Sequence, residues 1–376
     1  MVIDGRHDHS IRIPRPDLSE RLHTPNACNQ CHKDKSAAWA KEQAEQWYGS
    51  DRTSEWHFGE SLLAAREHAP DAGRELVALA NSRKYPDIAR ATAVSLLAEF
   101  SYSVTVATLQ PLLVDPSPMV REAALGMVEN VNPEQRWQLA GELLGDPVYA
   151  VRIEAARVLA AVPERTLTPE QRALLAHGVS EYEAAQRVNA EHPHSHVNLG
   201  LLYSGQRKFE ESEAAYRQAL RLDPGYVPAY INLADLFRSQ GNEQQAAEVL
   251  LQAAKIDPQN AAVAHALGLH YVRTGNHQRA LKSLQRAVQL APQDVRYAYV
   301  YGVALYDNGR GREALAELER AHRLNPGDLD VLIALVSYSE LAGERQKANR
   351  YAHKIADIEP RLGNADQILE QIRNSR

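Results

Sequence analysis

The second half of the chain repeats one pattern of small, aromatic and proline residues. Prolines mark a period of 34 residues, at Pro224, Pro258, Pro292, Pro326 and Pro360. A small residue recurs at the same interval, followed three positions later by an aromatic one. The small residues are Gly200, Ala234, Gly268 and Gly302, and the aromatic position holds Tyr203, Phe237, Tyr271 and then Leu305. A fixed period of this length predicts stacked units of two helices, in which the small residue lets the helices approach closely.

Residues 193–362 resemble the tetratricopeptide repeat (TPR) family in this pattern, with five units. Alanines also recur in the second predicted helix of the units, at 246, 280, 314 and 348. The fifth unit is degenerate, because Val336 and Ser339 occupy the small and aromatic positions. Residues 365–376 then predict a closing helix, which a stacked array needs at its end.

A second period of 31 residues precedes the first one. It is marked by Arg90, Arg121 and Arg152, each followed by alanine three positions later. Two of the segments begin with Asp-Pro, where the proline can start a helix with one apolar face. Residues 55–165 therefore resemble HEAT repeats, which are also helical. A long amphipathic helix over about 168–191 is expected to join the two arrays.

The first fifty residues differ from both arrays. Pro14, Pro16 and Pro25 predict extended backbone without a long helix. A helix can begin after Ser36 and end at Gly49. We therefore predict an all-α fold, an α-solenoid of HEAT-like repeats followed by tetratricopeptide repeats, with an extended proline-rich N-terminal segment. Three domains are expected. Residues 1–50 form the N-terminal segment, for which the cysteines described below predict haem binding. Residues 51–166 form the HEAT-like repeats, and residues 167–376 form the TPR array with its cap helix.

Charge and hydropathy argue against two classes of partner. The net charge is −6 and no run of basic residues occurs, so no broad basic surface for nucleic acid or anionic membrane is expected. No segment approaches the length of apolar residues that a membrane-spanning helix needs. The N-terminus also lacks the basic start and apolar run of a signal peptide, so the sequence as it stands predicts no export.

The only two cysteines of the chain, Cys28 and Cys31, are followed at once by His32. Cys-x-x-Cys-His is the attachment motif of haem c, in which each thiol bonds one vinyl group of the porphyrin. The imidazole of the following histidine is then the proximal ligand of the iron. This spacing predicts one covalent haem c, with Cys28 and Cys31 as the thioether residues and His32 on the metal.

Three other interpretations of the cysteines stay open. A zinc site would need a fourth ligand beyond the three residues of the motif, such as His23 or His9. A thioredoxin-like dithiol would need a βαβ context, which the surrounding sequence does not show. Finally, the two thiols could be unmodified side chains.

The N-terminal sequence resembles a bacterial family of multihaem cytochromes c fused to HEAT and tetratricopeptide repeats. The resemblance rests on "DGRHDHSIRIPRPDLS" followed by "TPNACNQCHKDKSAAWA", and it spans essentially the whole chain. It implies export, further haem motifs upstream and electron transfer. Because this chain has one motif and no export signal, we expect either a truncated reading of a longer gene or a separate haem-plus-repeat piece.

A second axial ligand of the iron would come from a histidine near the motif. His9 lies in the Asp-His-Ser piece that the resemblance includes, so it is the first candidate for a distal or neighbouring-haem ligand. His57, at the entrance to the first solenoid helix, is the second candidate. Methionine is scarce, with Met1, Met119 and Met127 only, so His/Met ligation is not expected.

Tetratricopeptide arrays offer a concave groove lined by the first helix of each unit. The predicted groove is largely apolar and aromatic: Val197, Leu201, Ile231, Asp235, His265, Leu269, Tyr299, Val303 and Tyr306. It lacks the several basic and amide residues of a clamp for a terminal carboxylate. An apolar peptide, a helix or the surface of another cytochrome is the expected partner.

Two functions follow from these patterns. The first is electron transfer by one covalent haem on a helical platform that docks a redox partner or another haem domain, in the periplasm or outside the cell. The second is a scaffold without redox chemistry, cytoplasmic, with the cysteine motif unmodified or bound to zinc. No acid–base pair or nucleophile stands out, so an electron carrier or binding protein is expected rather than an enzyme by itself.

Overall fold

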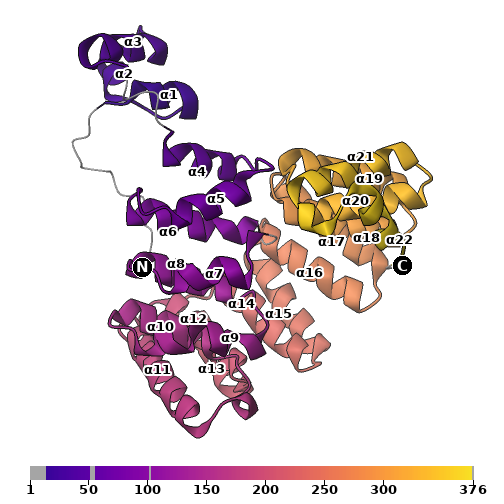
Figure 1. The fold of residues 1–376 in the computed structure, drawn as a ribbon. Helices are drawn as coiled ribbons and strands as arrows, with labels where there is room; N and C mark the ends of the chain where they lie inside the picture. The colour runs from indigo at the N-terminus through magenta and orange to yellow at the C-terminus, as the bar shows by residue number, and fades with distance from the viewer. Residues whose placement is uncertain (1–13, 51–55, 101–102, 375–376) are drawn as a thin grey trace. The chain divides into compact units, whose positions relative to one another are not determined.

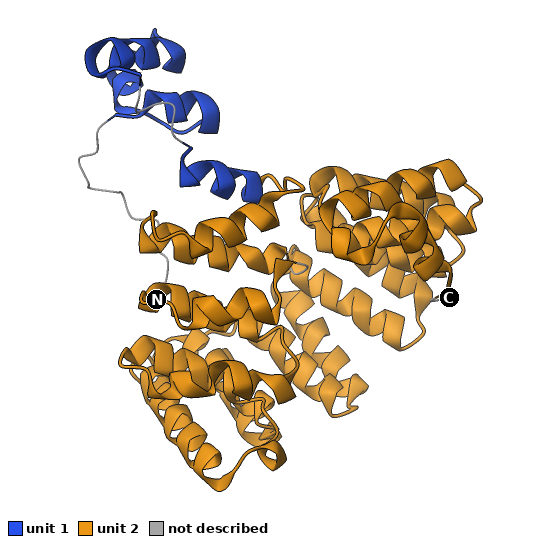
Figure 2. Ribbon diagram, in the orientation of Figure 1, with its two compact units in different colours: residues 1–66 blue, residues 67–376 orange. Residues whose placement is uncertain are grey.

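A computed structural model of the chain describes residues 14–50, 56–100 and 103–374 (Figure 1). All regular elements in these three ranges are helices, so the predicted helical solenoid is confirmed. The chain divides into two compact units, residues 1–66 and residues 67–376 (Figure 2). Within the described ranges, no helix is long and apolar enough to cross a membrane.

The described residues of the first unit form four helices: α1 (Pro16–Leu22), α2 (Ala27–Cys31), α3 (Ala37–Tyr48) and α4 (Phe58–Arg66). Helix α3 has the predicted limits, because the Ser36 hydroxyl accepts a hydrogen bond from the backbone N–H of Trp39 and Gly49 ends the helix with φ of 80°. The segment before α3 was expected to be extended, yet it forms two short helices. Pro16 is compatible with α1 because it occupies the first turn, where no backbone N–H is needed.

The second unit begins with helices in the region of the 31-residue period. These are α5 (Ala72–Asn81), α6 (Asp87–Leu96), α7 (Val106–Leu113), α8 (Pro118–Val128), α9 (Pro133–Ala140) and α10 (Tyr149–Leu159). Short 3-10 turns follow or separate them at Leu97–Glu99, Gly141–Gly145 and Glu164–Thr166. Helix α8 packs against both α6 and α10, as neighbouring units of one array should.

The three repeated arginines form a ladder of ion pairs between neighbouring units. Arg121 binds Asp146 with both ends of its guanidinium, at 2.7 and 2.9 Å, and both side chains are largely buried. Arg90 binds Asp115 in the same way one unit earlier. Both carboxylates belong to the Asp-Pro pairs of the sequence, so the aspartate that precedes each helix is held by the arginine of the previous unit. Arg152 continues the ladder to Glu181, at 2.8 Å.

A long helix, α11 (Pro169–Arg187), leads into the second array, as predicted. Thr168 caps it, since its hydroxyl accepts from the N–H of Gln171 while the Gln171 side chain accepts from the Thr168 N–H. Five helix pairs and a last helix follow. The pairs are α12 (Pro193–Gly205) with α13 (Phe209–Leu222), α14 (Val227–Ser239) with α15 (Glu243–Ile256), α16 (Ala261–Arg273) with α17 (His277–Leu290), α18 (Val295–Asp307) with α19 (Gly311–Leu324), and α20 (Leu329–Leu341) with α21 (Arg345–Ile358); a 3-10 turn at Pro360–Leu362 precedes α22 (Ala365–Asn374).

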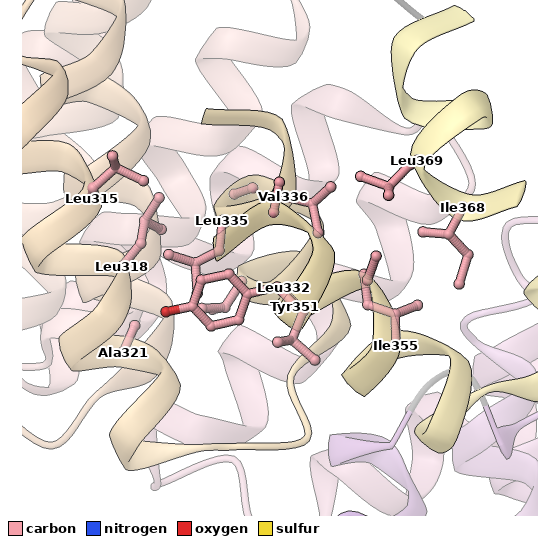
Figure 3. Packing of buried hydrophobic residues seen from close by; sticks show 14 of the residues in the cluster. Leu315, Leu318, Ala321, Leu332, Leu335, Val336, Tyr351, Ile355, Ile368 and Leu369 are labelled. Atoms are coloured by element: carbon pink, nitrogen blue, oxygen red, sulfur yellow. The ribbon is translucent and has the colours of Figure 1, made fainter. Parts of the chain in front are cut away.

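The small residues of the repeat are required by the close approach of the paired helices. A Cβ atom at Gly200 would lie 2.3 Å from Cε1 of Tyr216, and one at Gly268 would lie 2.6 Å from the Leu284 side chain. The end of the array is closed by α22, whose Ile368 and Leu369 pack into the apolar cluster of α19, α20 and α21 (Figure 3). The predicted cap helix is therefore present, although the fifth unit lacks the usual small and aromatic residues.

Candidate functional site

The cysteine motif lies on a single helical turn in the first unit. Both cysteines belong to α2, three residues apart, which places them on the same face of the turn. Asn26 caps the turn through a hydrogen bond from the Asn29 N–H to its side-chain oxygen, at 3.0 Å. The His32 N–H ends the turn by donating to the Cys28 carbonyl, at 2.9 Å. The sequence therefore brings two thiols and one imidazole together within a short, capped segment.

The side chains of Cys28, Cys31 and His32 are at least partly exposed and are free to bond another group. Both thiols are free, with Cys28 half-buried and Cys31 exposed. His32 is exposed, and neither of its ring nitrogens has a hydrogen-bond partner in the described part of the chain. Its ring lies 5.0 Å from that of Trp39 on α3, at an angle of 55°. The residues thus fit attachment of haem c, because the thiols share one face and the imidazole is free to bind a metal.

Of the two candidates for a second iron ligand, His57 has other partners in the described part of the chain. His9 lies outside the described residues. His57 lies before α4, where its Nδ1 accepts from the Gly59 N–H at 3.1 Å and its ring centroid lies 4.1 Å from that of Phe58, with the rings tilted by 32°. Burial lowers the pKa of His57, and the nearby charge of Arg15 lowers it further. No hydrogen bond, ion pair or ring contact joins His57 to the cysteine turn among the residues described, so both ligand assignments stay predictions.

The described residues contain no complete set of ligands for the alternative zinc site. In residues 14–50, 56–100 and 103–374, no three or more His, Cys, Asp or Glu side chains are grouped as in a metal site. The three residues of the motif therefore form no such group with a fourth ligand among the described residues, and His9, one of the two candidates for that ligand, lies outside them.

The second candidate site is the groove of the tetratricopeptide array. A cavity of about 210 Å³ lies between the first helices α14, α16 and α18, with α15 behind it. We call it the groove pocket. It is lined by Ile231, Ala234, Asp235, Ala246, Leu250, Ala262, His265, Ala266, Leu269, Arg273, Arg296 and Tyr297. Four residues predicted for the groove, Ile231, Asp235, His265 and Leu269, therefore share one pocket.

The other predicted groove residues have different surroundings. Val197 is buried in the core, so its assignment to the groove was wrong. Tyr299 packs against the core of the last units. Tyr306 stacks face to face on Tyr338 at 3.7 Å. Leu201 is half-exposed. The helical period alone placed these residues on one face, but the superhelical twist of the array turns part of that face towards neighbouring helices.

His265 is a buried polar residue of the groove pocket. Only 8% of the residue is exposed, and its Nδ1 is buried without a hydrogen-bond partner among the described residues. Its ring stacks on Tyr297, with the ring centroids 4.6 Å apart. Burial lowers the pKa of His265, and Arg296 lowers it further, so the imidazole is neutral at pH 7. The pocket therefore presents a neutral, stacked ring rather than a cation.

Two arginines at the groove pocket were missed by sequence reasoning. Arg273 is paired with Glu243 at 3.2 Å. Arg296, by contrast, has no carboxylate within ion-pair distance in the described part of the chain. The sequence could show that Arg296 lies at the start of the first helix of a unit. The direction of its side chain, however, depends on the twist between units. The pocket thus combines apolar walls with an unpaired guanidinium at one side.

Comparisons with known proteins agree with the repeats of the fold. The tetratricopeptide repeat model matches residues 197–261 and 265–328, and the HEAT repeats model matches residues 74–160. Neither matched family is a cytochrome family. No curated protein matches the chain. The chain therefore carries a HEAT array followed by a TPR array, as the two sequence periods predicted.

Several solved structures resemble part of the chain. MamA is 22% identical with a TM-score of 0.39, covering 45% of this chain and 93% of that one. YrrB, described as a TPR protein with an unusual peptide-binding site, is 25% identical with a TM-score of 0.39, covering 51% of this chain and 97% of that one. PilF of Pseudomonas aeruginosa is 16% identical with a TM-score of 0.43, covering 60% of this chain and 99% of that one.

Proposed function

We propose that this protein is a helical-repeat scaffold whose groove pocket binds a peptide segment of a partner protein. The observation that carries the proposal is the pocket between α14, α16 and α18, which has apolar walls and a buried, unpartnered His265 Nδ1. A buried polar atom without a partner costs free energy, so a ligand that hydrogen-bonds to it would gain affinity. Peptides offer both apolar side chains and backbone groups for such a pocket.

The charge of the groove pocket limits the sequences of the peptides that we expect it to bind. Ile231 and Leu269 offer contacts to an apolar side chain, and Arg296 offers an unpaired guanidinium beside it. Guanidinium groups bind carboxylates with two hydrogen bonds. The preferred segment therefore has an apolar residue followed or preceded closely by Asp or Glu.

A peptide-display selection with the full chain tests this proposal. Selected peptides should share an apolar residue beside an acidic one. Their affinity should fall at least about tenfold for Leu269→Glu, since a charge would be placed against the apolar anchor. Leu251→Glu is the matched control, because Leu251 is an exposed leucine on the second helix α15. Equal loss of affinity in both variants, or no enrichment of any motif, would reject the groove pocket as the binding site.

A second function, a c-type cytochrome segment, is favoured by the geometry of the cysteine turn. Cys28 and Cys31 would hold haem c, and His32 would be its proximal ligand. The haem would supply reversible one-electron transfer between ferrous and ferric iron. The scaffold would then dock a redox partner or another haem domain, outside the cytoplasm, as in the multihaem family that the sequence resembles. His9 or His57 would be the second ligand in that case.

Expression of the full chain behind a bacterial export signal, together with a cytochrome c maturation system, separates the two functions, because haem c is attached outside the cytoplasm. A covalent haem remains on the denatured protein and gives a peroxidase stain on a gel. The stain should weaken in Cys28→Ser and in Cys31→Ser, each of which loses one thioether, and should disappear when both substitutions are combined, because no covalent bond to the haem then remains. An unstained wild-type band with two titratable thiols would leave the scaffold alone. If the wild type is stained, a changed absorption spectrum of the haem in His57→Ala would support His57 as the second ligand.

A further inference from the structure

The second helices of the last two repeats line an open hollow at the surface, apart from the groove pocket. It has a volume of about 430 Å³ and lies between α19 and α21. We call it the basic hollow. It is lined by Glu319, His322, Arg323, Lys347, Arg350, Tyr351 and Lys354. The peptide groove is lined by first helices, so this hollow is a separate feature of the array.

The basic hollow has more cations than carboxylates. Lys347 is neutralised by Glu319 at 3.2 Å and by Glu344 at 2.8 Å. No carboxylate of the described chain lies within ion-pair distance of Arg323, Arg350 or Lys354. The guanidinium of Arg350 lies over the ring of Tyr351, 5.1 Å from its centroid. Four cations and one carboxylate thus line the hollow, and three of the cations have no ion-pair partner among the described residues, in a protein whose net charge is −6.

His322 positions one of these cations. Its exposed fraction is 8%, and its Nε2 lies 2.7 Å from the Lys354 ammonium. An ammonium can only donate, so Nε2 must be the acceptor and the ring proton must lie on Nδ1. The imidazole is therefore neutral and leaves the charge of Lys354 uncompensated. His322 holds the ammonium beside the two guanidiniums, because all three cations line the same hollow.

We propose that the basic hollow binds a phosphoryl group. Two arginines offer planar pairs of N–H donors, which match phosphate oxygens, and Lys354 adds a third cation. A phosphate ester carries close to two negative charges at neutral pH, so it neutralises this excess better than a single carboxylate does. The same chemistry belongs to a free phosphorylated small molecule and to a phosphorylated residue of a protein. The site is independent of the peptide-binding proposal above.

Calorimetric titration of the full chain with pyrophosphate tests the site. We expect saturable binding that weakens as the salt concentration rises. Arg323→Gln and Arg350→Gln should each weaken binding by about tenfold or more, because each removes a charge-assisted pair of hydrogen bonds. Arg345→Gln is the matched control, since Arg345 is an exposed arginine at the start of α21 outside the hollow. Unchanged helicity in the circular dichroism spectrum shows that each variant is folded.

A second titration distinguishes the two sources of the phosphoryl group. A phosphoserine peptide that binds more tightly than pyrophosphate, and is displaced by it, identifies a protein source. Tighter binding of pyrophosphate identifies a small-molecule source. The proposal is overturned if pyrophosphate shows no saturable binding at millimolar concentration, or if Arg323→Gln and Arg350→Gln bind it as well as Arg345→Gln does.

Discussion

At the residue scale, one turn of the TPR array is strained. Four repeats use glycine after the first helix, at Gly241, Gly275, Gly309 and Gly343, with φ between 72° and 79°. The first repeat has Arg207 at the same position, with φ of 61°. A left-handed backbone costs a non-glycine residue about 1 kcal/mol, because its Cβ approaches the following carbonyl.

Arg207→Gly should therefore stabilise the chain by up to about 1 kcal/mol. The measurement is the free energy of unfolding in urea, with Lys208→Gly as a control at the next, exposed position, where φ is negative. The control should be destabilising, since glycine there only adds freedom to the unfolded chain. A loss of stability in Arg207→Gly would contradict the assignment of strain.

A second residue-scale prediction concerns His322 and pH. Burial, followed by the charges of Lys354, Arg350 and Arg323, lowers the pKa of His322 from 6.5 to about 4, while Glu319 acts in the opposite direction. The unfolded chain therefore binds a proton more readily than the folded chain between these two values. The contribution to stability is complete above pH 6.5 and is lost as the pH falls towards 4.

Thermal melting between pH 7 and pH 5 measures this effect. The wild type should lose stability across this range, and His322→Leu should lose less, because the buried titratable group is gone. His353→Leu on α21 is the control, since His353 is exposed and should leave the slope unchanged. Identical slopes for the wild type and His322→Leu would show that the imidazole is not desolvated.

At the scale of elements, the arginine ladder holds the HEAT units together. Burial would favour the neutral carboxyl of Asp146, but hydrogen bonds from Arg121 and from the Val148 N–H outweigh it, so the pKa lies below its ordinary value. The ion pair therefore persists down to acidic pH. Removing one partner leaves the other charge buried and unpaired, which typically costs about 3–5 kcal/mol.

Arg121→Met is accordingly expected to destabilise the chain by about 3–5 kcal/mol, measured by urea unfolding. Arg121→Met combined with Asp146→Asn should recover much of this loss, because no buried charge remains. Arg165→Met serves as the control, since its pair with Glu134 is exposed and should contribute less than about 1 kcal/mol. Equal effects of Arg121→Met and Arg165→Met would mean that the ladder does not stabilise the array.

Sequence reasoning predicted the elements better than their contacts. The limits of α3 followed from Ser36 and Gly49, and α11 followed from its amphipathic pattern, because caps and helix periods are local properties. The periodic arginines were recognised as markers, but their partners Asp115 and Asp146 lie 25 residues further on. Such pairs depend on how one unit stacks on the next, which no local pattern contains.

The same limit applies to the candidate sites. The motif of Cys28, Cys31 and His32 could be read directly, because its three residues are adjacent in the chain. Only some of the residues that line the groove pocket could be predicted, because the twist between α16 and α18 brings Arg296 to it. The basic hollow was not predicted at all, because its residues come from two helices of different repeats.

At the scale of the whole molecule, the two arrays and the cysteine turn represent different kinds of chemistry. The repeats of the second unit offer extended surfaces, and their stability comes from contacts between neighbours. The cysteine turn belongs to the first unit, where it is held by the Asn26 cap and by the contact of His32 with Trp39. Loss of the haem residues should therefore leave the repeats folded. The circular dichroism spectrum and melting curve of Cys28→Ser should match those of the wild type.

Photo-cross-linking of a selected peptide tests the central claim, that the groove pocket binds partner segments, most directly. A benzophenone amino acid replaces Leu269 in the groove pocket or Leu251 on the second helix α15. Mass spectrometry then locates any bond to the peptide. We predict strong cross-linking from position 269 and little from position 251, with unlabelled peptide suppressing the signal. Cross-linking from position 251 alone, or equally from both positions, would contradict the account.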